Sequence, residues 1–117
     1  MEAVARARFV RIPPRKLRLI ADIVRGKKVE EVMHILPFVP KRGAKIVLKV
    51  VKSAVSNLAT KKKELRVDEE LLYIKEIKVD EGPRLKRFRA ASMGRAAPYV
   101  HRLSHLTVIV GEKEGDK

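Results

Sequence analysis

GPRLKRFRAASMGRAAPYVHR, residues 82–102, is the stretch of sequence that decides the fold. It holds few large apolar side chains and keeps neither the helical nor the strand period, so it has no core of its own. Gly94 lies near its middle and strand-like runs flank it at 71–79 and 103–110, which favours a long hairpin. About ten residues per strand would extend about 30 Å. Because an isolated hairpin is marginal in water, we expect something outside the chain to order this arm, with a flexible basic loop as the alternative.

The arm belongs to an acid-free block in a strongly basic chain. The 117 residues carry a formal net charge of +14, from 28 Lys and Arg against 14 Asp and Glu. Residues 82–111 hold six bases and no acid, and residues 32–63 hold eight bases and no acid. Residues 1–28 hold nine bases against two acids. Residues 64–81 reverse the sign, with seven acids against three bases. A surplus serving solubility alone would mix the signs. The blocks therefore predict surfaces that meet phosphate, in nucleic acid or, alternatively, in an anionic membrane.

Composition excludes several classes of protein. A hydrophobic content of 45% suits one domain with a modest core, and no apolar run is long enough to span a membrane. Met1 is followed by no apolar leader, and the absence of cysteine excludes disulfide frameworks, zinc fingers and thiol catalysis. His101 and His105 have no cysteine or nearby carboxylate to complete a metal site, and no phosphate-cradling loop is present. We predict no catalytic residue, no metal and no cofactor.

The first elements are predicted from periodicity. Weak alternation over residues 2–10 favours an edge strand with one basic face. Its other side would carry Ala3, Ala5, Ala7 and Phe9. A helix follows from Pro14, whose missing N–H costs nothing in a first turn, and Gly26 is its expected end. A shorter helix covers 29–36, before Pro37.

The clearest helix runs from Lys41 to about Leu58. Its apolar stripe predicts core packing. A second stripe consists of Lys41, Lys45, Lys49 and Lys52. No acid lies four residues from any of these lysines to pair with it, which favours an external anion.

Longer segments match a known pattern. They are 7–12 (ARFVRI), 14–20 (PRKLRLI), 22–26 (DIVRG), 41–44 (KRGA), Ser53 and Ala54 with Asn57, 79–83 (VDEGP), 86–87 (KR), 94–96 (GRA) and 104–108 (SHLTV). In order and spacing, over nearly the whole chain, they resemble bacterial large-subunit ribosomal protein twenty-two, the exit-tunnel hairpin family. The chain departs from that pattern at the hairpin tip and at Pro13, where members carry a serine able to cap the helix. Pro98 removes a ladder donor, so we expect irregular pairing there.

The resemblance implies an α+β fold in which three helices pack on a three-stranded antiparallel sheet with a long projecting β-hairpin. Residues 1–117 would form one domain, with a globular core at 1–81 and 103–117 and an extended hairpin at 82–102. The implied function is that of a structural, non-enzymatic component of the large ribosomal subunit, in the cytoplasm. Its implied partners are large-subunit rRNA, neighbouring ribosomal proteins and the nascent polypeptide, which its hairpin meets as it lines the exit tunnel.

The expected functional residues follow from the charge blocks and the resemblance. Those expected to bind rRNA are Arg6, Arg8, Arg11, Arg15, Lys16, Arg18, Arg25, Lys41, Arg42, Lys45, Lys49, Arg84, Lys86, Arg87, Arg95 and Arg102. The expected tunnel tip consists of Arg89, Ala90, Ala91, Ser92, Met93, Gly94 and Arg95.

A strongly basic chain is also compatible with three other binding functions. A basic DNA-binding module is the main alternative, although bases spread over every element instead of one recognition helix. An anionic-membrane binder would need the apolar stripe that the core uses. An aromatic content of 4% disfavours a single-strand binder that works mainly by stacking.

Overall fold

The order of helices and strands confirms the expected α+β class. The computed structural model describes the backbone of residues 2–62, 69–90 and 96–112, and the side chains of residues 2–62, 70–84 and 102–112. The elements in chain order are β1 (Glu2–Val10), α1 (Pro14–Val24), α2 (Val29–Ile35), the 3₁₀ turn η1 (Leu36–Phe38), α3 (Arg42–Lys62), the 3₁₀ turn η2 (Glu69–Leu71), β2 (Leu72–Ala90) and β3 (Ala96–Glu112).

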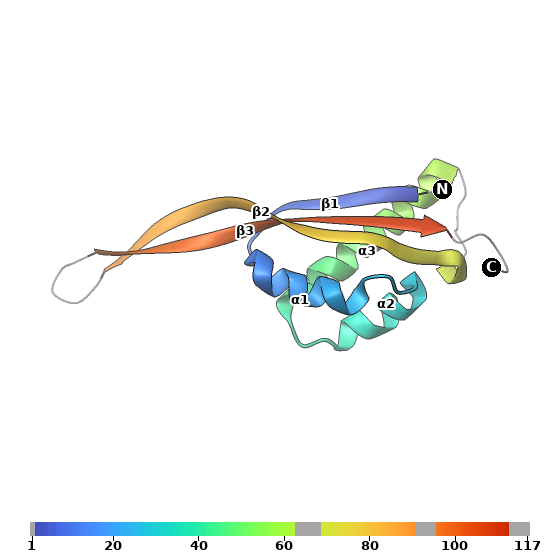
Figure 1. Ribbon diagram of the computed structural model, residues 1–117, viewed down its shortest axis with the longest axis horizontal. Coiled ribbons are helices and arrows are strands. Elements are labelled where there is room, and N and C mark those ends of the chain that lie inside the picture. Colours follow the sequence, from blue (N-terminus) through green and yellow to red (C-terminus); the bar gives the residue numbers. More distant parts are fainter. Residues whose placement is uncertain (1, 63–68, 91–95, 113–117) are drawn as a thin grey trace.

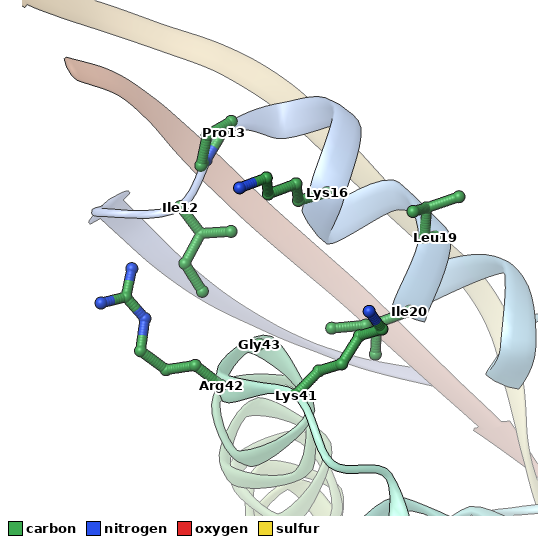
Figure 2. Close-up of a pocket in the computed structure, with 8 residues that line it drawn as sticks. All are labelled: Ile12, Pro13, Lys16, Leu19, Ile20, Lys41, Arg42 and Gly43. Atoms are coloured by element: carbon green, nitrogen blue, oxygen red, sulfur yellow. The ribbon is translucent and has the colours of Figure 1, made fainter.

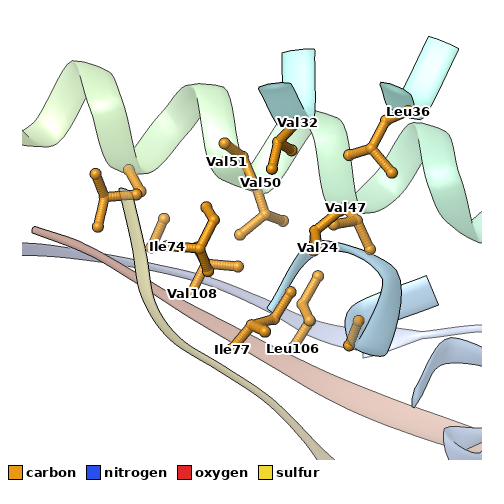
Figure 3. Packing of buried hydrophobic residues seen from close by; sticks show 14 of the residues in the cluster. Val24, Val32, Leu36, Val47, Val50, Val51, Ile74, Ile77, Leu106 and Val108 are labelled. Atoms are coloured by element: carbon orange, nitrogen blue, oxygen red, sulfur yellow. The ribbon is translucent and has the colours of Figure 1, made fainter. Parts of the chain in front are cut away.

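The three strands form one antiparallel sheet in the order β1-β3-β2, so β1 and β2 are its edges. All three helices cover the same face of this sheet (Figure 1). Alternate strand residues point into that face and meet the apolar stripes of the helices (Figure 3). The strand residues buried in this layer include Ala3, Ala5, Leu72, Ile74, Ile77, Val79, Leu106, Val108 and Val110. Each fully buried Val, Leu or Ile contributes about 1.5–3 kcal/mol, so this layer holds the body of the molecule together.

Helix α1 begins and ends where the sequence predicts. No side chain caps its first turn, because the preceding residue is Pro13, whose carbonyl accepts bonds from the N–H groups of Lys16 and Leu17, both at 3.1 Å. Its apolar stripe is buried. Gly26 has a φ of +76°, a region that side chains other than hydrogen disfavour. A glycine at this position therefore ends the helix.

Helix α3 runs four residues beyond its expected end at Leu58. The additional turn is held by contacts to both neighbouring strands. The ammonium of Lys61 donates to the carbonyl of Glu2 at 2.8 Å, and Lys62 forms an ion pair with Glu112 at 2.5 Å. These partners are distant in sequence, so the helical period alone does not reveal them.

The start of α3 packs closely against α1 at Gly43. A Cβ on this residue would lie 2.5 Å from Cδ1 of Ile20 and 3.2 Å from Cδ1 of Leu17. Real Cβ atoms do not approach other carbon atoms as closely as the first of these distances. The two helices therefore depend on a glycine at their crossing, where interiors have no spare volume.

The arm consists of the outer parts of β2 and β3, which continue past the helices (Figure 1). The strand-like runs at 71–79 and 103–110 are thus the inner parts of two longer strands. The pairs from Arg84 opposite Arg102 to Ala90 opposite Ala96 keep one register. With this arm the chain has a radius of gyration of 17.6 Å, against about 13 Å for a compact chain of its length.

The expectation of irregular pairing at Pro98 is wrong. Pro98 lies opposite Phe88 within the unbroken ladder. In a two-stranded arm, alternate N–H groups point away from the partner strand. A proline can occupy such a position without removing a ladder hydrogen bond.

Of the three register shifts in the described strands, one lies in the body between Ile74 and Glu76, and two lie at the root of the arm, where it joins the body. Of the two at the root, one lies between Ala7 and Val10 of β1, and the other between Glu81 and Arg84 of β2. Phe9 lies in the shift of β1 and has a φ of +57°. The alternation of β1 reverses there, so Val10 is buried and Phe9 is 57% exposed. This corrects the prediction that Phe9 shares the side of the buried alanines.

Candidate nucleic-acid interface

The expected RNA-binding side chains are exposed wherever the structure describes them. These are Arg6, Arg8, Arg11, Arg15, Lys16, Arg18, Arg25, Lys41, Arg42, Lys45, Lys49, Arg84 and Arg102. Exposure alone does not make them equivalent. Some lie on surfaces without an acid, and others donate to the backbone of the protein itself.

The lysine stripe, Lys41, Lys45, Lys49 and Lys52, is exposed along α3. The opposite side of the same helix is buried against the sheet. The first turn of α3 contains no acid, so the positive end of the helix dipole adds to the charge of Lys41 and Arg42. An anion is the partner that this arrangement favours.

A cavity of about 470 Å³ separates the start of α1 from the start of α3. Figure 2 shows Lys16 on the α1 side and Arg42 on the α3 side, with apolar side chains such as Ile12 between them. Within the described part of the chain, no acid lines this cavity. The guanidinium of Arg42 also donates to the carbonyl of Arg11 at 2.5 Å, which fixes its position. The cavity therefore brings three residues that are expected to bind rRNA, Lys16, Lys41 and Arg42, to one place.

Two arginines meet at the root of the arm. Arg84 of β2 lies directly opposite Arg102 of β3, and both side chains are exposed. Like charges directly opposite each other in a sheet are destabilising. A bridging phosphate would remove that cost, because each guanidinium can donate to its oxygens.

The remaining expected residues belong to the outer arm. Lys86, Arg87, Arg89 and Ala90 have their backbones in β2, and their side chains lie outside the described residues. Ala91, Ser92, Met93, Gly94 and Arg95 lie outside the described residues altogether.

Arg18 and Arg25 form a different group, because both donate to the outer edge of β2. The guanidinium of Arg18 reaches the carbonyl of Val79 from Nε at 3.2 Å and from Nη2 at 2.9 Å. Arg25 donates from Nη2 to the carbonyl of Ile77 at 3.0 Å and also forms an ion pair with Asp22. These carbonyls, two residues apart on an edge strand, would otherwise be unpaired. Arg18 and Arg25 therefore stabilise the fold. Counting charges along the sequence did not predict this role.

The other edge of the sheet is covered in the same way. From α3, Asn57 donates to the carbonyl of Val4 at 2.9 Å, and Lys61 donates to the carbonyl of Glu2. Helix residues four apart thus reach strand carbonyls two apart. The sequence contains no local signal for this match, because the strand and the helix are more than fifty residues apart.

One exposed residue near the basic surface was missed as a functional candidate. The ring of Phe9 meets the ring of His105 edge to face, with centroids 5.0 Å apart and planes at 87°. The N–H of Phe9 donates to Nδ1 of His105 at 3.1 Å. Arg6 and Arg8 line a cavity beside this pair. Only the register shift, which the sequence does not announce, turns Phe9 outward.

Two properties of the described residues bear on other functions. None of the helices found there has the length and apolar character needed to cross a membrane. Within the same residues, His, Asp and Glu side chains do not gather in groups of three that could hold a metal ion.

The chain matches known proteins over nearly its whole length. Residues 5–111 match the family model described as ribosomal protein L22p/L17e. Three similar proteins bear the name large ribosomal subunit protein uL22. That of Bifidobacterium animalis subsp. lactis is 51% identical and is covered, like this chain, over 100% of its length. The protein of Thermus thermophilus is 50% identical, and the match covers 98% of this chain and 99% of that protein. The protein of Syntrophus aciditrophicus is 49% identical, and the match covers 97% of this chain and 100% of that protein. A match of this extent identifies the chain as a member of the ribosomal protein L22p/L17e family.

Proposed function

We propose that the chain is a structural, non-catalytic component of the large ribosomal subunit that binds large-subunit rRNA. As a member of its family it is a ribosomal protein, which works with rRNA and other ribosomal proteins in translation. The observation that carries the proposal is the pair Arg84 and Arg102, exposed like charges opposite each other in the acid-free block 82–111. A polyanion supplies the counter-charge that the block 82–111 lacks.

We propose that the residues at the interface bind mainly phosphate. The lysine stripe offers point charges along a helix, and the arginines offer forked donors that match phosphate oxygens. The set comprises Arg6, Arg8, Arg11, Arg15, Lys16, Lys41, Arg42, Lys45, Lys49, Arg84, Lys86, Arg87, Arg95 and Arg102. Arg18 and Arg25 contribute charge, while their described contacts hold β2. Such a surface recognises the shape of folded RNA more than its sequence.

We propose further that the arm, 82–102, runs inward through rRNA and lines the nascent-peptide tunnel, with residues 89–95 at its tip. The body, 1–81 and 103–117, then anchors the arm on the surface of the subunit. An arm that extends the chain to 67 Å along its longest axis supports this role, because it carries the basic segment away from the helices. RNA would supply the packing that two strands alone lack.

The salt dependence of binding tests the proposal. We would measure the affinity of the full chain for large-subunit rRNA of Thermus thermophilus, the source of a 50% identical relative, over a series of salt concentrations. Each phosphate contact contributes about 0.7–0.9 to the slope of log K against log salt, so we expect a steep negative slope. A slope near zero would falsify the proposal.

A competition experiment separates the proposal from the DNA-binding alternative. Duplex DNA is added to the protein bound to the same rRNA at fixed salt. We expect excess duplex to displace little of the protein, because the basic side chains follow a surface formed by several elements. Displacement at equal concentration of phosphate would favour the DNA-binding reading.

A further inference from the structure

Phe9 adopts a backbone conformation that its residue type disfavours. Its φ of +57° is the only positive value among the described residues other than glycine. Such a conformation costs of order 1 kcal/mol or more and persists where the surroundings enforce it. At this position it has one visible consequence, which is to turn an aromatic ring out of the sheet, so that 57% of the residue is exposed.

Although it is exposed, the ring of Phe9 contacts a second ring of the protein. His105 contacts it edge to face, and Nδ1 of His105 accepts the hydrogen bond from the Phe9 N–H. A ring whose backbone and neighbour are both fixed loses little freedom when a planar ligand stacks on it.

The surroundings of Phe9 suit a nucleotide. Arg6, Arg8 and Asp80 line the adjacent cavity of about 290 Å³ together with the Phe9–His105 pair. The two arginines can meet a phosphate at the rim. The carboxylate of Asp80 repels a phosphate inside the cavity but can accept a hydrogen bond from a base amino group. A base inside the cavity and its phosphate at the rim would give both the carboxylate of Asp80 and the two arginines a suitable partner.

From this geometry we propose that Phe9 is a stacking platform for one unpaired RNA base, whose phosphate lies against Arg6 and Arg8. The inference rests on the proposed function, since it names how one point of the interface meets rRNA. It is compatible with the low aromatic content, because one exposed ring serves one base. An apolar side chain of a neighbouring protein is the alternative occupant, which the experiment below distinguishes.

Substitutions at Phe9 test the platform in the full chain. With the same Thermus thermophilus rRNA, Phe9→Leu should weaken binding by about 5- to 150-fold, the range found when one base loses an aromatic partner. Phe9→Tyr keeps the π face and should bind within about 3-fold of wild type. The matched control is Phe38→Leu on η1, where the native ring is 85% exposed, and it should leave binding unchanged.

Folding is monitored with a second variant. Phe9→Gly removes the ring at a φ that glycine adopts freely, so its urea midpoint should equal or exceed that of wild type while its binding falls like that of Phe9→Leu. The salt slope should stay the same in all Phe9 variants, because no phosphate contact is removed.

Ultraviolet cross-linking identifies the occupant. We expect a nucleotide adduct on the peptide containing Phe9 in the protein–rRNA complex, and none on the peptide containing Phe38. A steep wild-type salt slope together with unchanged affinity in Phe9→Leu would overturn the stacking proposal alone. A flat wild-type slope would overturn the proposed function and this inference with it. A cross-link from Phe9 to a ribosomal protein in assembled subunits, without a nucleotide adduct, would assign the ring to the alternative occupant.

Discussion

The guanidinium of Arg18 donates two hydrogen bonds to a single acceptor, the carbonyl of Val79, at 3.2 and 2.9 Å. This contact joins α1 to β2, an edge strand of the sheet. Arg18→Ala should therefore lower the free energy of unfolding by about 1–2 kcal/mol, because the carbonyl loses a charged donor. Urea denaturation of the free protein measures this change.

Arg15 is the matched control for Arg18, since it is exposed on the same helix and belongs to the proposed phosphate-binding set. Arg15→Ala should change stability by less than about 0.5 kcal/mol and should instead reduce the salt slope for rRNA. Equal loss of stability in the two variants would contradict the division between fold-supporting and RNA-binding arginines.

Ser104 makes a buried contact at the root of the arm. Its hydroxyl donates to the carbonyl of Ile12 at 2.5 Å, and Ser104 is fully buried. Ser104→Ala should destabilise the protein by about 1–3 kcal/mol, because it leaves a buried carbonyl without its donor. Ser53→Ala, on the exposed side of α3, is the control and should be near neutral. Thermal unfolding of both variants decides the matter, and a neutral Ser104→Ala would show that the bond contributes nothing.

The crossing of α1 and α3 predicts a specific rescue. Gly43→Ala should cost about 1–3 kcal/mol, because the new Cβ would lie 2.5 Å from Cδ1 of Ile20. Ile20→Val deletes that Cδ1 atom. The double variant should therefore lose less free energy of unfolding than the two single variants lose in total. A double-mutant cycle measures the coupling, expected at about 0.5–3 kcal/mol. Strict additivity would mean that the helices separate instead of clashing.

The lysine stripe should act through salt-sensitive contacts. Lys45→Gln combined with Lys49→Gln should reduce the magnitude of the salt slope for rRNA by about 1.4–1.8, if each lysine neutralises one phosphate. Lys75→Gln is the control, because the structure pairs Lys75 with Glu2 in an ion pair. The idea fails if the control and the double variant change the slope equally.

Local periodicity and turn chemistry were enough to predict most of the fold. Pro14, Gly26 and the apolar stripe of α3 located the helices, and Gly94 with its flanking strands indicated the hairpin. These signals are local, since they depend on residues within a few turns of one another. The order of the strands and their packing against the helices came from the family resemblance, which rests on segments spread along the whole chain.

The errors arose where distant segments determine the structure. Phe9 reverses its side because β1 must match β3 after a register shift, and no residue near Phe9 signals that shift. The internal contact of Arg18 was missed for the same reason, because its partner is a backbone carbonyl sixty-one positions away. Charge patterning locates a basic surface but does not say which of its side chains the protein itself uses.

The unbroken ladder of the arm has a consequence for how this protein could change over time. The register shifts at Ala7–Val10 and Glu81–Arg84 lie at the base of the arm, where irregular pairing bends a strand, and the paired residues beyond them set its reach. Inserting two residues into each strand would lengthen the arm by about 7 Å and keep every side chain on its original face. Inserting one would turn the outer faces over. We therefore expect the arm to tolerate insertions of an even number of residues in each strand, because such insertions change its length and keep its side chains on their original faces.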